Sequence, residues 1–246
     1  MGLERRRSQY LEAMGIPVWV PRVAPPEPFV PEAESCVAPD TPPEPSPPVI
    51  AESATASPVA AYDWDDLAAC VASCTACPLH RTRTQTVFGV GNRGARLMVI
   101  GEAPGEQEDL KGEPFVGRAG QLLNEMLRAI GFAREDVYIA NILKCRPPGN
   151  RDPQAEEVDA CEAYLQRQVA LLAPKVVLAA GRIAAQNLLK TATPIGKLRG
   201  RVHSYRAIPL VVTYHPAYLL RTPGEKRKAW DDLRLALRTL REEQSK

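Results

Sequence analysis

The chain has 246 residues, enough for one or two domains of roughly 150 residues each. Its 45% hydrophobic and 24% charged residues are ordinary for a water-soluble protein, and no apolar run approaches the ~20 residues of a membrane-spanning helix. The net charge is only +2, the first residues lack the apolar core of a secretory signal, and six cysteines are too sparse for a disulfide-stapled secreted scaffold, so we expect a cytoplasmic protein.

The N-terminal quarter differs from the rest of the chain. Residues 1–20 form a short amphipathic segment that either frays or docks, on a protein partner or on the main domain. Residues 21–60 contain 12 of the 24 prolines and a net charge of −5, so we expect a disordered linker. Residues 61–246 carry a net charge of +6 and are expected to fold as one domain with a polyanionic partner.

Short apolar runs and helix-like stretches alternate through this domain. The expected strands are 97–100, 137–140, 176–180 and 210–214; the expected helices are 122–130, 154–172, 181–189 and a C-terminal helix with Trp230, Leu233, Leu237 and Leu240 on one face. This alternation predicts an α/β domain with a mainly parallel sheet. In such sheets ligands bind beyond the carboxyl ends of the strands, which are followed here by residues 101–105, 141–148, 181–182 and 215–221.

The cysteine spacing indicates a metal site. Cys74 and Cys77 form a CxxC pair, and Cys145 and Cys161 form a wider pair with fifteen residues between them. Four thiolates can hold either a 4Fe-4S cluster or a tetrahedral zinc ion, and the spacing does not distinguish them. The plainer alternative is a redox-active dithiol or simply buried thiols, and Cys70 is a less suitable competing ligand.

Several loop residues are candidates for ligand binding. The turn Gly101–Gly105 leads into an acidic loop, 106–109, and exposes backbone N–H groups. Phe115 could stack on a planar ligand, Asn141 has the donor and acceptor of a pyrimidine-reading amide, and His215 is placed to donate a hydrogen bond. Each has a structural alternative: core packing, turn capping and an ordinary buried histidine. The GxGxxG at 89–94 precedes a strand instead of following one, so we interpret it as a turn.

A basic surface is expected near the C-terminal part of the domain. Lys197, Arg199, Arg201 and His203 alternate, which would place them on one face of an extended segment. With Arg221 they would contact phosphates, while Leu219 and Leu220 would form an apolar wedge. The alternative is an ordinary solvated face.

Taken together, these motifs resemble the iron–sulfur, family 4 uracil-DNA glycosylases. The resemblance runs from about residue 64 to 240 and rests on separate, ordered motifs: the Cys74–Cys77 pair, GEAPG at 101–105, PFVGRAG at 114–120, NILKCRP at 141–147 and HPAY at 215–218. It implies a three-layer α/β/α sandwich around a four-stranded parallel sheet. It also implies that Cys74, Cys77, Cys145 and Cys161 hold a structural 4Fe-4S cluster, which favours iron–sulfur over zinc.

The resemblance further implies a monomeric repair enzyme, associated with the nucleoid, that removes uracil from DNA. The uracil would leave the base stack, lie on Phe115, be read by Asn141 and touch the backbone around Gly101, Glu102 and Ala103. His215 would stabilise the departing uracil anion.

Two positions depart from the best-known uracil glycosylases. Ala103 stands where those enzymes have a water-activating Asp, and Gly105 where they have a thymine-blocking Tyr. We therefore take Glu102 as the candidate base and Glu108 as the candidate group that excludes thymine. Two alternatives stay open: a branch that traps its product covalently through a histidine, and a metal-stabilised nucleic-acid-binding module without catalysis. The nucleotide-binding oxidoreductase is disfavoured by the misplaced glycine motif.

Overall fold

The computed structural model describes residues 58–243 of the chain. The amphipathic segment 1–20 and almost all of the expected linker 21–60 lie outside these residues. Within the described part, no helix has the length and apolarity needed to cross a membrane.

A six-stranded sheet forms the centre of the domain, in the order β1-β3-β2-β4-β6-β5. The four inner strands are parallel, and the two edge strands run antiparallel to their neighbours. The strands are β1 (Val90–Gly91), β2 (Leu97–Gly101), β3 (Tyr138–Asn141), β4 (Val176–Ala180), β5 (Val202–Tyr205) and β6 (Ile208–Thr213). The expected parallel four-stranded sheet is therefore confirmed, and the structure adds an antiparallel strand at each edge.

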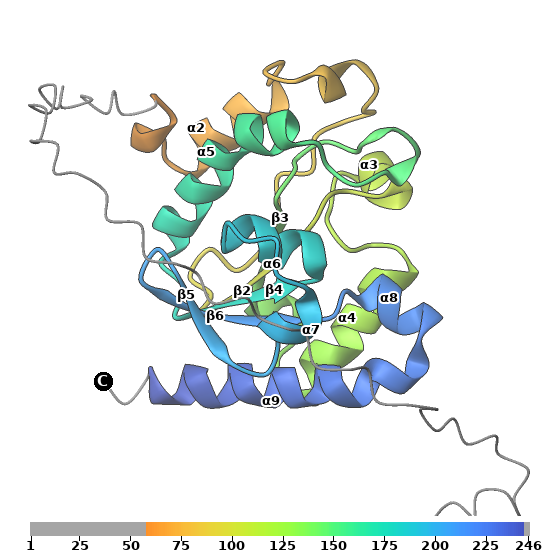
Figure 1. Cartoon of the computed structure of the whole chain (residues 1–246). Helices are drawn as coiled ribbons and strands as arrows, with labels where there is room; N and C mark the ends of the chain where they lie inside the picture. Colours follow the sequence, from red (N-terminus) through yellow and green to blue (C-terminus); the bar gives the residue numbers. More distant parts are fainter. Residues whose placement is uncertain (1–57, 244–246) are drawn as a thin grey trace, which may run out of the picture. The chain divides into compact units, whose positions relative to one another are not determined.

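The inner strands are continuous apolar runs because helices bury both faces of the sheet. One face carries Met98 and Ile100 of β2 and packs against α5 (Ala155–Leu172), α6 (Arg182–Leu188) and α7 (Ile195–Leu198). The other carries Leu97 and Val99 and packs against α4 (Arg118–Ala129), α8 (Pro216–Arg221) and α9 (Lys226–Glu242). Figure 1 shows α9 and α4 on one side of the sheet and α5 on the other, which is the expected α/β/α sandwich.

The remaining elements are short. Helix α2 (Trp64–Ala72) packs against α5 through Leu67, Val71 and Tyr164. Helix α3 (Glu106–Lys111) follows β2, so the expected acidic loop 106–109 is in fact helical, with Gly105 as its N-cap. The 3-10 turns are η1 (Pro58–Ala61), η2 (Pro78–Arg81), η3 (Arg134–Asp136), η4 (Pro148–Asn150) and η5 (Pro223–Glu225).

Two expectations about the C-terminal part were wrong. Lys197 lies in α7 and Arg199 follows it, so residues 197–203 are not one extended segment with a single basic face. Trp230 is 41% exposed, and the buried apolar residues of α9 are Ala229, Leu233, Ala236 and Leu240. The reason is the helix period: residues 229, 233, 236 and 240 follow the three-to-four-residue spacing of one face, and Trp230 points one step away.

Candidate functional site

A cavity with a volume of about 750 Å³ opens in the described part of the chain. It lies beyond the carboxyl ends of the parallel strands β2, β3, β4 and β6, where an open α/β sheet binds its ligands. Its walls include Phe115, Asn141 and His215, three residues that are far apart in the sequence. The parallel sheet brings them together at one edge. Asn141 is the last residue of β3, His215 comes shortly after β6, and Phe115 lies in the connection that follows β2 and α3.

Gly101, Asn141 and Phe115 pack against one another at the base of the cavity. A Cβ atom on Gly101 would lie 2.4 Å from Asn141 Oδ1 and 2.6 Å from Phe115 Cζ, so only glycine fits there. Asn141 ends β3 and is 2% exposed, and its Oδ1 has no hydrogen-bond partner among the described residues. A buried amide oxygen without a partner at a cavity wall costs free energy unless a ligand satisfies it.

His215 lies against the ring of Phe115. The two rings are stacked with their centroids 5.5 Å apart and an interplanar angle of 28°. The Nδ1 atom of His215 accepts the backbone N–H of Ala217 at 3.1 Å, which leaves the proton of the neutral ring on Nε2. Burial lowers the pKa of His215 to about 4, and Arg221 adds to this effect while Glu108 opposes it. The imidazole is therefore neutral at pH 7 and carries a free N–H donor.

Glu102 lies at the start of the loop after β2 and also lines the cavity. Burial raises its pKa to about 7, the negative charge of Asp152 raises it further, and Arg182 lowers it. A carboxyl group with a pKa near 7 can gain or lose a proton at the pH of the cell.

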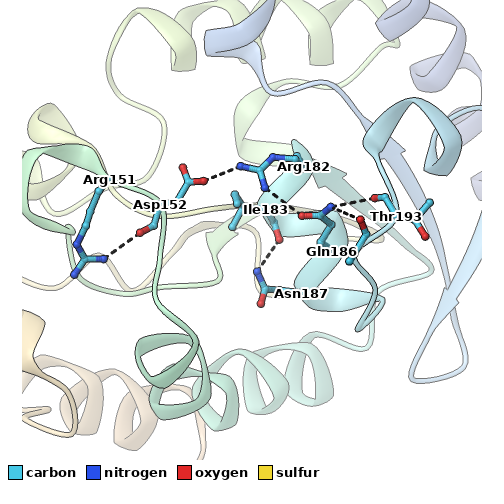
Figure 2. A network of polar contacts seen from close by, with 8 residues as sticks. Arg151, Asp152, Arg182, Ile183, Gln186, Asn187 and Thr193 are labelled. Carbon is cyan, nitrogen blue, oxygen red and sulfur yellow. Dashed lines mark hydrogen bonds and ion pairs between the residues drawn. The ribbon is translucent and has the colours of Figure 1, made fainter.

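A polar network lies along the wall formed by Asp152 and Arg182. Arg182 Nη2 binds Asp152 Oδ2 at 2.7 Å, and its Nη1 lies 3.3 Å from Gln186 Oε1. Gln186 in turn donates to the carbonyl groups of Ala192 and Thr193 (Figure 2). The network ties the loop after β3 to the N-terminus of α6 and so fixes the charges that surround Glu102.

Glu108, in α3, bonds to two backbone segments near Phe115. One carboxylate oxygen accepts the backbone N–H groups of Val116 and Gly117 at 2.9 and 3.0 Å, and the other accepts that of Gly105 at 3.1 Å. The carboxylate also lines the cavity, as does the side chain of Ala103. Glu108 is thus a wall residue with its oxygens bonded to backbone amides.

The two leucines of the expected apolar wedge differ in exposure. Leu219 is 1% exposed and packs in the core, whereas Leu220 is 37% exposed. The difference arises because residues 216–221 form helix α8, where adjacent residues point about 100° apart. Arg221 is exposed and lines the cavity, so it lies at the rim, and the exposed Leu220 is its neighbour in α8.

Arg199 does not lie on the surface as expected for a phosphate contact. Its side chain is 14% exposed, its Nε binds Asp232 Oδ2 at 2.9 Å, and its guanidinium packs over the ring of Tyr214. Burial raises the pKa of Asp232 to about 6, and Arg199 opposes that rise. Arg201, in contrast, is exposed.

Four of the cysteines lie on the side of the sheet covered by α5. Cys77, Cys145 and Cys161 are buried in one cluster, Cys74 is half-buried, and all four are free thiols. Arg83 Nη1 lies 3.0 Å from the sulfur of Cys145, and Tyr164 donates to that of Cys74 at 3.2 Å. Within residues 58–243, no three His, Cys, Asp or Glu side chains are positioned around a single metal ion.

The buried thiols of Cys161 and Cys145 each have a cation nearby. Burial raises the pKa of Cys161 to about 11 while Lys144 opposes the rise, and burial also raises the pKa of Cys145 while Arg83 opposes it. Cys145 and Cys77 also raise the pKa of Cys161, so these thiols are close enough to interact electrostatically. Buried sulfur donors with nearby cations suit a cofactor that binds thiolates.

Several cavity residues were missed by the sequence analysis. Asp152, Arg182, Tyr214 and Tyr218 all line the cavity without having been assigned a role there. For Arg182 and Tyr214 the available signal was their position directly after Gly181 and Thr213, at the carboxyl ends of β4 and β6. Asp152 had no such signal, since its role depends on the fold of the loop that carries it.

Comparison with known proteins identifies the family of this chain. The sequence profile of the Uracil DNA glycosylase superfamily matches residues 88–234. The chain is 47% identical over 178 residues to a type-4 uracil-DNA glycosylase of Archaeoglobus fulgidus, a match that covers 69% of this chain and 89% of the relative. It is 42% identical to a type-4 enzyme of Pyrobaculum aerophilum over 70% and 91% of the two chains.

A more distant relative is a type-5 uracil-DNA glycosylase of Pyrobaculum aerophilum, which is 30% identical over 63% of this chain and 83% of the relative. The type-4 relatives are thus more similar to this chain than the type-5 relative is. The profile spans more than half of the sequence and ends within α9, so it includes every wall of the cavity described above. The chain therefore belongs to the uracil-DNA glycosylase superfamily, and within it to the type-4 enzymes.

Proposed function

We propose that this protein is a repair glycosylase that takes uracil out of DNA and hydrolyses its N-glycosidic bond, leaving an abasic site. The observation that carries the proposal is the convergence of Phe115, Asn141 and His215 on one cavity that follows the parallel strands. An aromatic face, an amide edge and an imidazole N–H together match a flat pyrimidine with carbonyl oxygens and a ring N–H.

Uracil binding follows from the geometry at Gly101. Because a side chain at 101 would collide with Asn141 and Phe115, the glycine keeps both groups within reach of the same base. The unpartnered amide of Asn141 then bonds to the Watson–Crick edge of uracil, and the ring of Phe115 stacks on its face. Backbone groups of Gly101, Glu102 and Ala103 lie at the same strand end and contact the base.

His215 stabilises the leaving group. Cleavage of the glycosidic bond places negative charge on uracil and positive character on the sugar. The neutral His215 donates its Nε2 proton in a hydrogen bond to a uracil carbonyl oxygen, which steadies that charge as it develops. A preorganised donor of this kind contributes about 10²–10³ in rate.

Glu102 is the candidate group for activating water. Its ionised form would orient a water molecule and accept a proton as the oxygen bonds to the sugar carbon. Glu108 is the candidate for excluding thymine, because it lines the cavity near the Phe115 ring. If that assignment is right, Glu108→Ala will release thymine from DNA, and full rejection of thymine by this variant would contradict it.

DNA would lie across the rim of the cavity. Exposed Leu220 would enter the space left by the flipped base, and Arg221 and Arg201 would contact phosphates. Arg199 is left out of this surface because Asp232 and Tyr214 already occupy its guanidinium.

The four free thiols would hold a 4Fe-4S cluster through Cys74, Cys77, Cys145 and Cys161. Such a cluster would link the segment before η2, the loop after β3 and helix α5, and the proposed reaction needs no redox step. Membership in the type-4 enzymes and the sulfur-only donor set support this assignment.

The test is to incubate the full-length protein with oligonucleotides that contain either uracil or thymine at one position. Free uracil and alkali-labile sites should appear only with the first, and His215→Ala should lower the rate by about 10²–10³. Release of neither base would contradict the proposal. An SDS-resistant adduct with uracil DNA would instead favour the branch that traps its product covalently.

A further inference from the structure

Phe115 lies in a turn with an uncommon backbone conformation. Its φ angle is +53°, in the left-handed region that residues with a side chain rarely adopt. The ring is only 6% exposed and is stacked on His215. A conformation of this kind persists only where the surrounding structure holds it in place. Residues 114–117, which we name the Phe115 turn, are therefore expected to be held by their neighbours.

Two oppositely charged side chains bond to the backbone of the Phe115 turn. Glu108 accepts the N–H groups of Val116 and Gly117. Arg134, from η3, donates to the carbonyl oxygens of Pro114 and Phe115 at 2.5 and 3.2 Å. Each of the four residues in the turn thus has one backbone group bonded to one of these two side chains.

The guanidinium of Arg134 also bonds to the helix that follows the turn. Its Nη1 also lies 3.3 Å from Asn124 Oδ1 of α4, so its bonds all lie around the turn and the helix beneath it. Burial lowers the pKa of Arg134, while the neighbouring carboxylates, Glu108 among them, raise it. A planar guanidinium with several fixed donors is suited to bonding two adjacent carbonyl groups at once.

The helix that follows the turn blocks one direction of movement. A Cβ atom on Gly120 would lie 1.7 Å from the carbonyl oxygen of Phe115, so the first turn of α4 packs directly against this peptide. The backbone cannot relax toward α4. Its position relative to His215 is then set by the bonds from Glu108 and Arg134.

We propose that Arg134 is a positioning residue for Phe115: together with Glu108 it holds the Phe115 turn so that the ring stays in place to stack on the extruded base. The inference rests on the proposed function, since the ring acts on uracil. Arg134 itself does not line the cavity. Its effect on the reaction passes entirely through the backbone of residues 114 and 115.

The experiment measures single-turnover excision of uracil at saturating enzyme, together with DNA affinity and Tm. Arg134→Met removes the donors but keeps an unbranched side chain, and should slow excision by about 10²-fold, the effect of a misplacement of about 1 Å. DNA affinity should stay within about twofold, because the rim is untouched. Arg134→Lys should recover part of the rate, since an ammonium can donate to a carbonyl oxygen but lacks the planar fork.

Arg128→Met is the matched control. Arg128 lies in α4, is exposed, and bonds only to Glu125 in the described residues, so its loss should leave the excision rate unchanged. A second comparison uses Phe115→Ala: in that background Arg134→Met should add little, because the ring that it positions is absent.

The outcomes separate this inference from the proposed function. If the unmodified protein releases no uracil, the proposed function fails. If it does release uracil and Arg134→Met is fully active, the positioning role alone is wrong. It is also wrong if Arg134→Met slows excision equally with and without the Phe115 ring, or if the loss follows Tm and no rate returns in Arg134→Lys.

Discussion

At the residue scale, Gly101 has no room for a side chain beside two residues that line the cavity, Asn141 and Phe115. Replacement by alanine would place a methyl group against Asn141 Oδ1 and Phe115 Cζ, both of which are buried. Overpacking of this kind costs about 1–3 kcal/mol of stability, and it displaces the two groups that grip the base. Gly101→Ala should therefore slow uracil excision by about 10²-fold, as measured in single-turnover assays.

Gly196→Ala is the control for that variant, because a Cβ at residue 196 meets no atom within 4 Å. The control should keep full activity. If Gly101→Ala excised uracil as fast as the unmodified protein, Asn141 and Phe115 would not both need their observed positions, and the proposed mode of binding would be wrong.

Glu102 predicts the pH dependence of the reaction. Its pKa is raised to about 7, mainly by burial, and a base must be ionised to activate water. The excision rate should therefore rise with pH through about 7. His215, with a pKa near 4, is neutral throughout that range and adds no step above pH 5. In Glu102→Gln the rate should be lower and flat with pH.

The neighbours of Glu102 allow a sharper version of this prediction. Asp152 raises the pKa of Glu102 and Arg182 lowers it. In Asp152→Asn the first effect is lost and Arg182 is left without its carboxylate partner, so the midpoint of the pH–rate profile should move to lower pH. A midpoint that stayed at the same pH would mean that another group controls the rate.

At the scale of elements, Arg199 joins the segment after α7 to helix α9 and to Tyr214 beyond β6. Asp232 is 0% exposed, so removing Arg199 leaves a buried carboxylate without its cationic partner. Breaking such a pair costs about 3–5 kcal/mol. Arg199→Met should therefore lower the free energy of unfolding by about this amount in urea titrations at pH 8, where Asp232 is charged.

The sign of the pH effect is fixed by Asp232. Its pKa in the folded protein is raised to about 6, so it takes up a proton as the pH falls below that value. The defect in Arg199→Met should consequently shrink at pH 5. Arg201→Met, which removes an exposed charge, should leave stability unchanged and weaken DNA binding. A stable Arg199→Met with weak DNA binding would restore the original expectation of a phosphate contact.

At the scale of the whole molecule, the cysteines connect segments that are distant in the sequence. If Cys161 is a cluster ligand, Cys161→Ser should lower the iron content, reduce the visible absorption and lower Tm by about 2–4 °C for each kcal/mol of stability lost. A cofactor that binds only the folded chain adds its binding free energy to folding.

Cys70→Ser is the matched control for this variant. Cys70 lies in α2, one helical turn before Cys74, and its sulfur lies 4.0 Å from the hydroxyl of Tyr164. This variant should retain iron, absorption and Tm. Equal iron content in both variants would show that the assigned ligand set is wrong.

The sequence predicted those features that depend on local periodicity and on the ends of strands. Uninterrupted apolar runs identified the four parallel strands because a sheet covered by helices on both faces requires them. Asn141 and His215 could be placed in one site for a related reason: the carboxyl ends of parallel strands share one edge of the sheet. Family motifs added the stacking role expected for Phe115.

Only the tertiary structure decided features that depend on the rotation of helices and on contacts across the chain. Leu219 and Leu220 are adjacent leucines, yet one is buried and the other exposed, because α8 turns them apart. Nothing in the sequence distinguishes Arg199 and Arg134 from the other arginines. In the structure, each one bonds to groups that lie 10 to 33 positions away in the chain. Charge alone carries no information about such partners, since a guanidinium is equally suited to a phosphate, a carboxylate or two carbonyl groups until the fold brings one of them within reach.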